Sequence, residues 1–360
     1  MSSTLTRTVT PAVRPAWMRD DTMTTSKELV EKALNREEVE RIPFFAPFQG
    51  YWALGLEGVS VMDSINKPGL AAGAQYRAVE ECHIDGVEVM WDWLLPAEAM
   101  GCKVKIPEVG TIPTVSHVVN GHEDIDKLLI PDIKNFYRFK AARETAALMA
   151  EKLGKDHFLM VSLPSPFTLA GELRGVDYLM MDTFTDEEFA NALTRKSLEI
   201  LEAFTEEILK WDIDAVVICD PTASGDLISA DDYLKFSKPT MQSLGSKVRK
   251  GGKIHVNHIC GDTSDRLDIV ADTGCKAFSV DIQVDIGNAV AKMKDKIAII
   301  GNINPAKTLY SGTPDDVRKE TTDCLKKGGK RGFLLASGCD IPVGSKLENV
   351  RAMSEVFMNF

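Results

Sequence analysis

The chain has 360 residues, 44% of them apolar, and a formal net charge of −11 at pH 7. A chain of this length can bury a large core, as one α/β barrel or as two domains. The negative charge argues against a nucleic-acid partner, and no run approaches the roughly 18 consecutive apolar residues that a membrane span needs.

The composition also favours a cytoplasmic protein. The N-terminus lacks the apolar core of a signal peptide. Seven cysteines are an odd number without the clustering of a disulfide scaffold, which indicates reduced thiols. Some of these thiols are therefore free to bind a metal.

Residues 1–23 are rich in Ser, Thr, Pro and Arg and have no helical or strand periodicity, which predicts a mobile N-terminal extension. The domain proper, residues 24–360, begins with a helix that Thr25 or Ser26 caps. Its apolar face would carry Leu29, Val30, Ala33 and Leu34.

Short apolar or β-branched runs then alternate with stretches of helical period, such as residues 186–211. Eight runs predict strands: 42–47, 86–91, 158–163, 215–220, 253–260, 277–281, 297–302 and 332–337. No G-x-G-x-x-G or G-x-x-x-x-G-K-[ST] motif occurs, which disfavours a nucleotide-binding sheet. The pattern predicts a single TIM-type (β/α)₈ barrel.

Polar side chains follow the predicted strands at the end where such barrels hold their active sites. They are Asp92, Ser165, Asp220, His258, Cys260, Asp281, Asn302, Asn304, Cys339 and Asp340. Three aromatic side chains near these ends, Tyr51, Trp91 and Trp93, either line a cleft or pack in the core. We therefore expect the active site at the C-terminal mouth of the barrel.

Three of these residues form a candidate metal site. Side chains alternate along a strand, so His258 and Cys260 point to the same face, about 7 Å apart. Cys339 ends another apolar run. One imidazole and two thiolates suit Zn²⁺, and three protein ligands leave a fourth position for a substrate, as in catalytic zinc sites.

Four segments carry a family resemblance: "AVVICDPTASGDLISADDYLKF", "HVNHICGDTSDRLDIVADTGCKAFSVD", "AIIGNINPAKTLYSGTPDDVRK" and "LLASGCDIPVGSKLENVRAM". They resemble the uroporphyrinogen decarboxylase superfamily, and within it the zinc methyltransferase branch typified by the methylcobamide:coenzyme M methyltransferases. The likeness covers residues 25–360. It implies a barrel, a zinc ion held by His258, Cys260 and Cys339, and methyl transfer involving a corrinoid on a separate protein.

The resemblance leaves the small substrate open. One reading is transfer between methylcobalamin, carried by a corrinoid protein docked at the barrel mouth, and a small thiol such as coenzyme M. The alternative is a first-step transfer to cob(I)alamin from a methanol, methylthiol or methoxy-aromatic donor. A tetrapyrrole-binding decarboxylase is disfavoured, because residues 43–65 contain no Arg or Lys for the porphyrinogen carboxylates.

Two carboxylates are candidate catalytic residues, Asp220 and Asp281. Together with Asp340, they are candidates to fill the open zinc position or to orient His258 through its second ring nitrogen. Asp220 ranks first, because its stretch belongs to the mouth loop of the family. Arg174 and Lys346 are candidate cations for a sulfonate or phosphate tail on a thiol.

Overall fold

The computed structural model describes residues 24–293 and 295–360, so the expected extension at residues 1–23 lies outside the described residues. Eight parallel strands form one sheet in the order β1-β2-β5-β6-β7-β8-β9-β10. Their bounds are β1 Phe45–Ala46, β2 Gly86–Met90, β5 Phe158–Pro164, β6 Ala215–Cys219, β7 Ile254–Ile259, β8 Ala277–Val280, β9 Ala298–Ile303 and β10 Phe333–Ser337.

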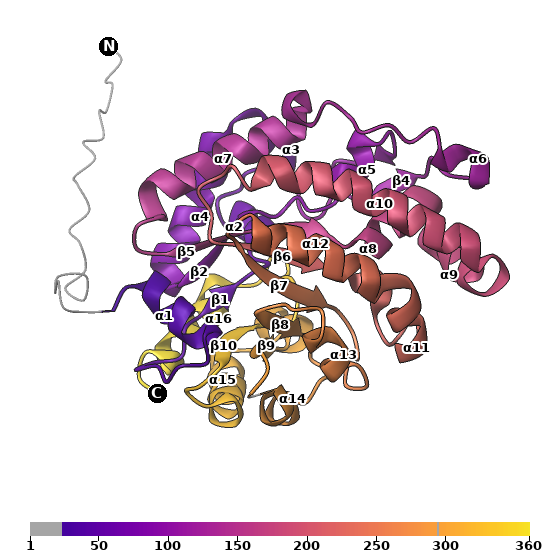
Figure 1. The fold of residues 1–360 in the computed structure, drawn as a ribbon. Helices are drawn as coiled ribbons and strands as arrows, with labels where there is room; N and C mark the ends of the chain where they lie inside the picture. The colour runs from indigo at the N-terminus through magenta and orange to yellow at the C-terminus, as the bar shows by residue number, and fades with distance from the viewer. Residues whose placement is uncertain (1–23, 294) are drawn as a thin grey trace, which may run out of the picture.

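The sheet closes on itself through its first and last strands. Phe44 bridges to Leu335 in parallel, and the Leu335 N–H donates to the Pro43 carbonyl at 3.0 Å. Surrounding helices complete a TIM-type (β/α)₈ barrel (Figure 1). The fold and the eight predicted strands are confirmed. Strand β1 is shorter than its apolar run, because the run contains Pro43 and Pro47 and neither proline has an N–H to donate.

The helices lie around the barrel and over its mouth. Their bounds are α1 Ser26–Leu34, α2 Gly50–Leu56, α3 Val61–Asn66, α4 Pro68–Cys82, α5 Leu95–Ala99, α6 His122–Ile125, α7 Tyr137–Leu153, α8 Pro166–Arg174, α9 Val176–Thr185, α10 Glu187–Ile208, α11 Ala230–Asp232, α12 Lys238–Lys250, α13 Leu267–Ala271, α14 Ile286–Met293, α15 Pro314–Gly328 and α16 Leu347–Phe357. The helix predicted over 186–211 is α10.

The first helix closes the N-terminal end of the barrel. The Thr25 side chain accepts from the Glu28 N–H, and the Glu28 carboxylate accepts from the Thr25 N–H, a reciprocal cap. The predicted apolar face of α1 is buried and packs against inward-facing residues of the strands, including Phe158, Met160 and Val256. The lower half of the barrel interior is therefore apolar and filled.

The upper half of the interior is polar. Because inward-facing residues recur at every second position, Val256 at the bottom of β7 is followed upward by His258. The same alternation brings Glu88 of β2, Ser162 of β5 and Ser279 of β8 inward, and all three are buried. These side chains form the floor of the barrel mouth.

An excursion between β2 and β5 was not predicted. It contains a two-stranded antiparallel sheet of β3 (Lys103–Val104) and β4 (Thr114–Ser116), which lies outside the barrel. Such short strands give too few residues for an alternating pattern to be recognised. No helix in residues 24–293 or 295–360 has the length and apolarity needed to cross a membrane.

Candidate metal centre and active-site cavity

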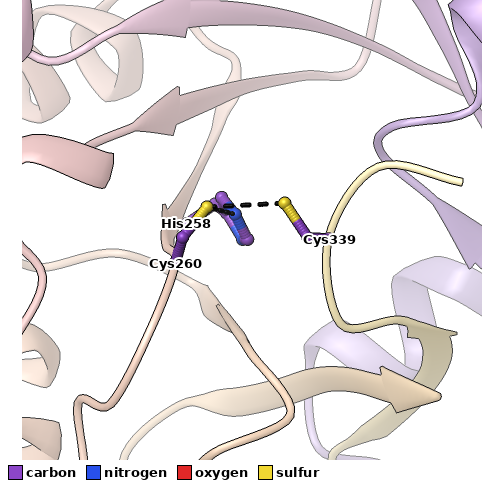
Figure 2. A group of neighbouring side chains, drawn as sticks. All are labelled: His258, Cys260 and Cys339. Carbon is purple, nitrogen blue, oxygen red and sulfur yellow. Dashed lines mark hydrogen bonds between the residues drawn. The ribbon is translucent and has the colours of Figure 1, made fainter. Parts of the chain in front are cut away.

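The three predicted metal ligands lie together at the C-terminal mouth of the barrel. The His258 Nε2 atom is 3.1 Å from the Cys260 Sγ atom, and the Sγ atoms of Cys260 and Cys339 are 3.4 Å apart. All three ligand atoms lie within 4.8 Å of one another (Figure 2). One imidazole and two thiols at this spacing fit a single zinc ion with a position left for a substrate.

Cys260 is placed by the turn that ends β7. Gly261, the next residue, has φ +76°, and a Cβ atom there would lie 2.2 Å from the Ser224 Oγ atom. A glycine is therefore required at this turn. The Gly261 N–H donates to the Asp281 Oδ2 atom at 2.8 Å, which ties the turn to the end of β8.

His258 is held from two sides. Its Nδ1 atom lies 3.0 Å from the Ser279 Oγ atom, and the two residues are register partners on β7 and β8. The Phe48 ring packs on the imidazole, with ring centroids 4.4 Å apart. The expectation that a carboxylate orients His258 is wrong, because the neighbouring strand presents a serine at that position.

Cys339 reaches the cluster from the turn after β10, where the Ser337 hydroxyl donates to the Cys339 carbonyl at 2.6 Å. The adjacent Cys260 thiol, together with burial, raises the pKa of Cys339 well above its ordinary value, while His258 opposes the shift. A bound cation would reverse this effect, because it stabilises thiolates. The remaining cysteines of the chain are also free thiols.

Asp220 lies just beyond β6 and is fully buried. Its carboxylate accepts hydrogen bonds from the hydroxyls of Ser165, Thr168 and Ser237. Burial raises the pKa of Asp220, and the three hydroxyls oppose that shift. Its contact with the cluster is through the backbone, since its N–H donates to the His258 carbonyl at 2.8 Å.

Asp281 acts on the loop geometry. Besides the Gly261 N–H, its carboxylate accepts the N–H of Ile282 at 2.6 Å. Both oxygens are thus used to hold backbone, one of them next to Cys260. This contact makes Asp281 a positioning residue for Cys260 in the described structure.

A cavity of about 120 Å³ opens beside the cluster. Two lining residues connect the cavity to the cluster. Phe48 also packs on the His258 ring, and Asp340 is the next residue in the chain after Cys339. The lining consists of aromatic, carboxyl and small or apolar residues: Phe48, Tyr51, Trp91, Trp93, Glu88, Asp340, Gly50, Gly110, Thr111, Ile341, Pro342 and Val343. Tyr51, Trp91 and Trp93 line this cavity and also pack in or against the apolar core, so both interpretations of these residues hold.

Two carboxyl groups face this cavity. Burial raises the pKa of Glu88 well above its ordinary value, and the Ser162 hydrogen bond opposes the shift. The Asp340 side chain is exposed to the cavity, and the desolvation that the surrounding walls impose raises its pKa to about 6. Glu88 was missed in the sequence, because a lone Glu within a buried strand has no distinguishing motif.

The candidate cations lie elsewhere. The Arg174 guanidinium pairs with Asp182, with 2.8 Å between Nε and Oδ2, and lies over the Tyr178 ring. Neither Arg174 nor Lys346 is among the described residues that line the cavity. The sequence therefore suggested two cations that the fold does not bring to this site.

Comparison with known proteins places the chain in a family. The model of the uroporphyrinogen decarboxylase (URO-D) family matches residues 25–360. The chain belongs to the uroporphyrinogen decarboxylase family. A solved structure described as a methyltransferase from Methanosarcina mazei superposes with a TM-score of 0.86, covering 94% of this chain and 99% of that one at 24% identity, which supports the fold.

Curated relatives in the URO-D family carry two activities. The methylcobamide:CoM methyltransferase MtbA of Methanosarcina acetivorans is 30% identical over 342 residues, covering 93% of this chain and 98% of the relative. The uroporphyrinogen decarboxylase of Chlorobium limicola is also 30% identical, over 315 residues, covering 84% of this chain and 88% of the relative. Percent identity alone therefore does not separate the two activities. The residues of the site have to distinguish them.

Proposed function

We propose that this protein is a zinc-dependent methyltransferase that moves a methyl group between a corrinoid on a partner protein and a small molecule. The corrinoid is methylcobalamin or cob(I)alamin, according to direction. The observation that carries the proposal is the convergence of His258, Cys260 and Cys339 within 4.8 Å at the barrel mouth. The similarity to methylcobamide:CoM methyltransferases supports it.

The donor set fits zinc, which when bound supplies a Lewis acid that stabilises a thiolate or a leaving anion at neutral pH. His258, Cys260 and Cys339 would hold the ion. Ser279 fixes the imidazole orientation, and Asp281 fixes the turn that carries Cys260. The aromatic walls of the adjacent cavity would exclude water from the small substrate.

The partner would approach from the C-terminal mouth, the end of the barrel where the cluster lies. His258, Cys260 and Cys339 would be accessible to a corrinoid docked there. Catalytic roles for Asp220 and Asp281 remain predictions. Their contacts favour support of the loops over direct contact with the substrate.

The small substrate has two candidates. Coenzyme M is named in several relatives and is the first thiol to test as an acceptor. The second candidate is a methyl donor such as methanol, a methylthiol or a methoxy-aromatic compound. The aromatic lining from Phe48, Tyr51, Trp91 and Trp93 favours that second reading.

Decarboxylation of a porphyrinogen is disfavoured by charge. Residues 43–65, which run from the first strand over the mouth, contain no Arg or Lys. The cavity they help to form carries two carboxyl groups, Glu88 and Asp340. A polycarboxylate substrate would find no cationic partner there.

The test is zinc stoichiometry combined with transfer. We expect about one zinc ion per chain, together with demethylation of methylcob(III)alamin by a thiol from a panel that includes coenzyme M. His258→Ala and Cys339→Ala should lose both. Cys324→Ala, which removes a buried thiol outside the cluster, is the matched control and should keep both.

Each result has a defined meaning. Zinc without thiol turnover would redirect the assay to methyl donors with cob(I)alamin. Absence of zinc from protein purified without chelators, and failure to bind added zinc, would contradict the proposal. Metal-independent porphyrinogen decarboxylation would replace it.

A further inference from the structure

The cavity beside the metal cluster has an unusual combination of walls. Four aromatic rings and two carboxyl groups line it, and no lysine or arginine is among its described lining residues. A binding site for an anion would normally present cationic side chains or backbone donors. This lining instead resembles the aromatic and acidic surroundings in which proteins bind organic cations.

Glu88 is the residue that points to a ligand. It is 1% exposed, and its Oε1 atom accepts from the Ser162 hydroxyl. The Oε2 atom has no hydrogen-bond partner of normal geometry in the described part of the chain. The nearby Gly50 N–H acts to lower the pKa of Glu88, but burial has the larger effect and raises it.

A buried carboxyl oxygen without a partner costs free energy unless a ligand or water satisfies it. Glu88 lines the cavity, so a ligand there can reach it. A cationic or hydrogen-bond-donating group would satisfy it. An anionic group would lose its hydration and gain no opposite charge, so both effects act against it.

The cavity is next to the metal cluster. Phe48 contacts the His258 ring on one side and lines the cavity on the other. Asp340, on the cavity wall, directly follows Cys339. A small molecule whose reacting heteroatom lies at the cluster would therefore extend its other end into this cavity.

We propose that this cavity binds the tail of the small methyl carrier and selects cationic or uncharged tails over anionic ones. The inference rests on the proposed function, because it takes the cluster as the place where the carrier reacts. It deepens that function by naming the substrate class. It also ranks coenzyme M, whose tail is a sulfonate, below carriers that lack a negative charge.

A matched series of ligands tests the proposal. The probes are 2-(methylthio)ethylamine, 2-(methylthio)ethanol and 2-(methylthio)ethanesulfonate, which share the methylthioethyl group and differ in the charge of the tail. Binding to the zinc-loaded protein is measured by isothermal titration calorimetry. Quenching of tryptophan fluorescence gives a second readout, because Trp91 and Trp93 line the cavity.

We expect the ammonium compound to bind at least about tenfold more tightly than the sulfonate, with the alcohol between them. Glu88→Gln keeps the size of the side chain and should reduce the ammonium-to-sulfonate ratio by roughly threefold or more. Glu80→Gln is the matched control, since it removes an exposed carboxylate on α4. It should leave the ratio unchanged.

The order in the wild-type protein decides the proposal even if Glu88→Gln does not fold. Tightest binding by the sulfonate, equal affinities for all three compounds, or no binding by a zinc-loaded protein would each overturn it. These binding results do not depend on methyl transfer. Loss of zinc or of corrinoid demethylation would instead count against the proposed function, so the two failures are distinguishable.

Discussion

Two buried acidic regions of the same barrel mouth differ in how their carboxyl groups are satisfied. Asp220, at the end of β6, accepts from three hydroxyls. Glu88, on β2, has one hydroxyl donor and an oxygen without a partner. Both are almost fully buried. The difference indicates that the first region holds the fold together, while the second is left open for a ligand.

Among the substitutions considered, we expect the largest loss of folding stability at Asp220. Asp220→Ala leaves the hydroxyls of Ser165, Thr168 and Ser237 without their acceptor in a buried site. We expect a loss of about 2–4 kcal/mol in the free energy of unfolding, measured by urea denaturation of the metal-free protein. The metal site should survive in the folded fraction.

Asp220→Asn separates the structural role of Asp220 from the predicted catalytic one. An amide keeps one acceptor oxygen and the volume of the side chain. A variant that folds, binds zinc and still transfers methyl would exclude a catalytic carboxylate at this position. Loss of transfer in a protein of wild-type stability would show that the region does more than hold the fold.

Asp281, beside the metal centre, resembles Asp220 in that its carboxylate is fully hydrogen-bonded. Both of its oxygens accept backbone N–H groups, including that of Gly261 beside Cys260. Asp281→Asn should weaken zinc binding by roughly 10- to 100-fold, as loss of a supporting residue around a metal ligand does. Competition with a chromophoric chelator measures this, and Asp285→Asn on the nearby surface is the control. Unchanged affinity would remove Asp281 from the support of Cys260.

The smallest effect on stability is expected at Glu88. Its folded-state pKa is raised, so the folded protein takes up a proton and its stability falls as pH rises above the unfolded value. Glu88→Gln carries no charge to bury. At low pH its stability should lie within about 1 kcal/mol of the wild type, and it should become relatively more stable as pH increases.

Urea denaturation of the metal-free protein at several pH values checks this trend. The opposite slope, with the wild type gaining stability over Glu88→Gln as pH rises, would mean that the ionised carboxylate is satisfied in the fold. Glu88 would then belong with Asp220, and the contrast between the two regions would disappear.

Much of this architecture could be predicted from local patterns. Eight apolar runs gave the eight strands, and the capping residues before α1 gave its start. The two-residue alternation on β7 pointed His258 into the barrel, since side-chain direction in a strand depends only on position along it, and Cys260 follows in the turn directly after the strand. The arrangement of polar residues at strand ends then located the mouth of the barrel.

Hydrophobic period and strand polarity are local properties of the chain, so they fix which residues are able to meet. Which of these residues come into contact depends on how distant strands pair. The register of β7 against β8 gives His258 a serine partner, and closure of the barrel brings Cys339 within 3.4 Å of Cys260. The unsatisfied oxygen of Glu88 depends in the same way on what neighbouring strands and loops leave uncovered, which no local pattern encodes.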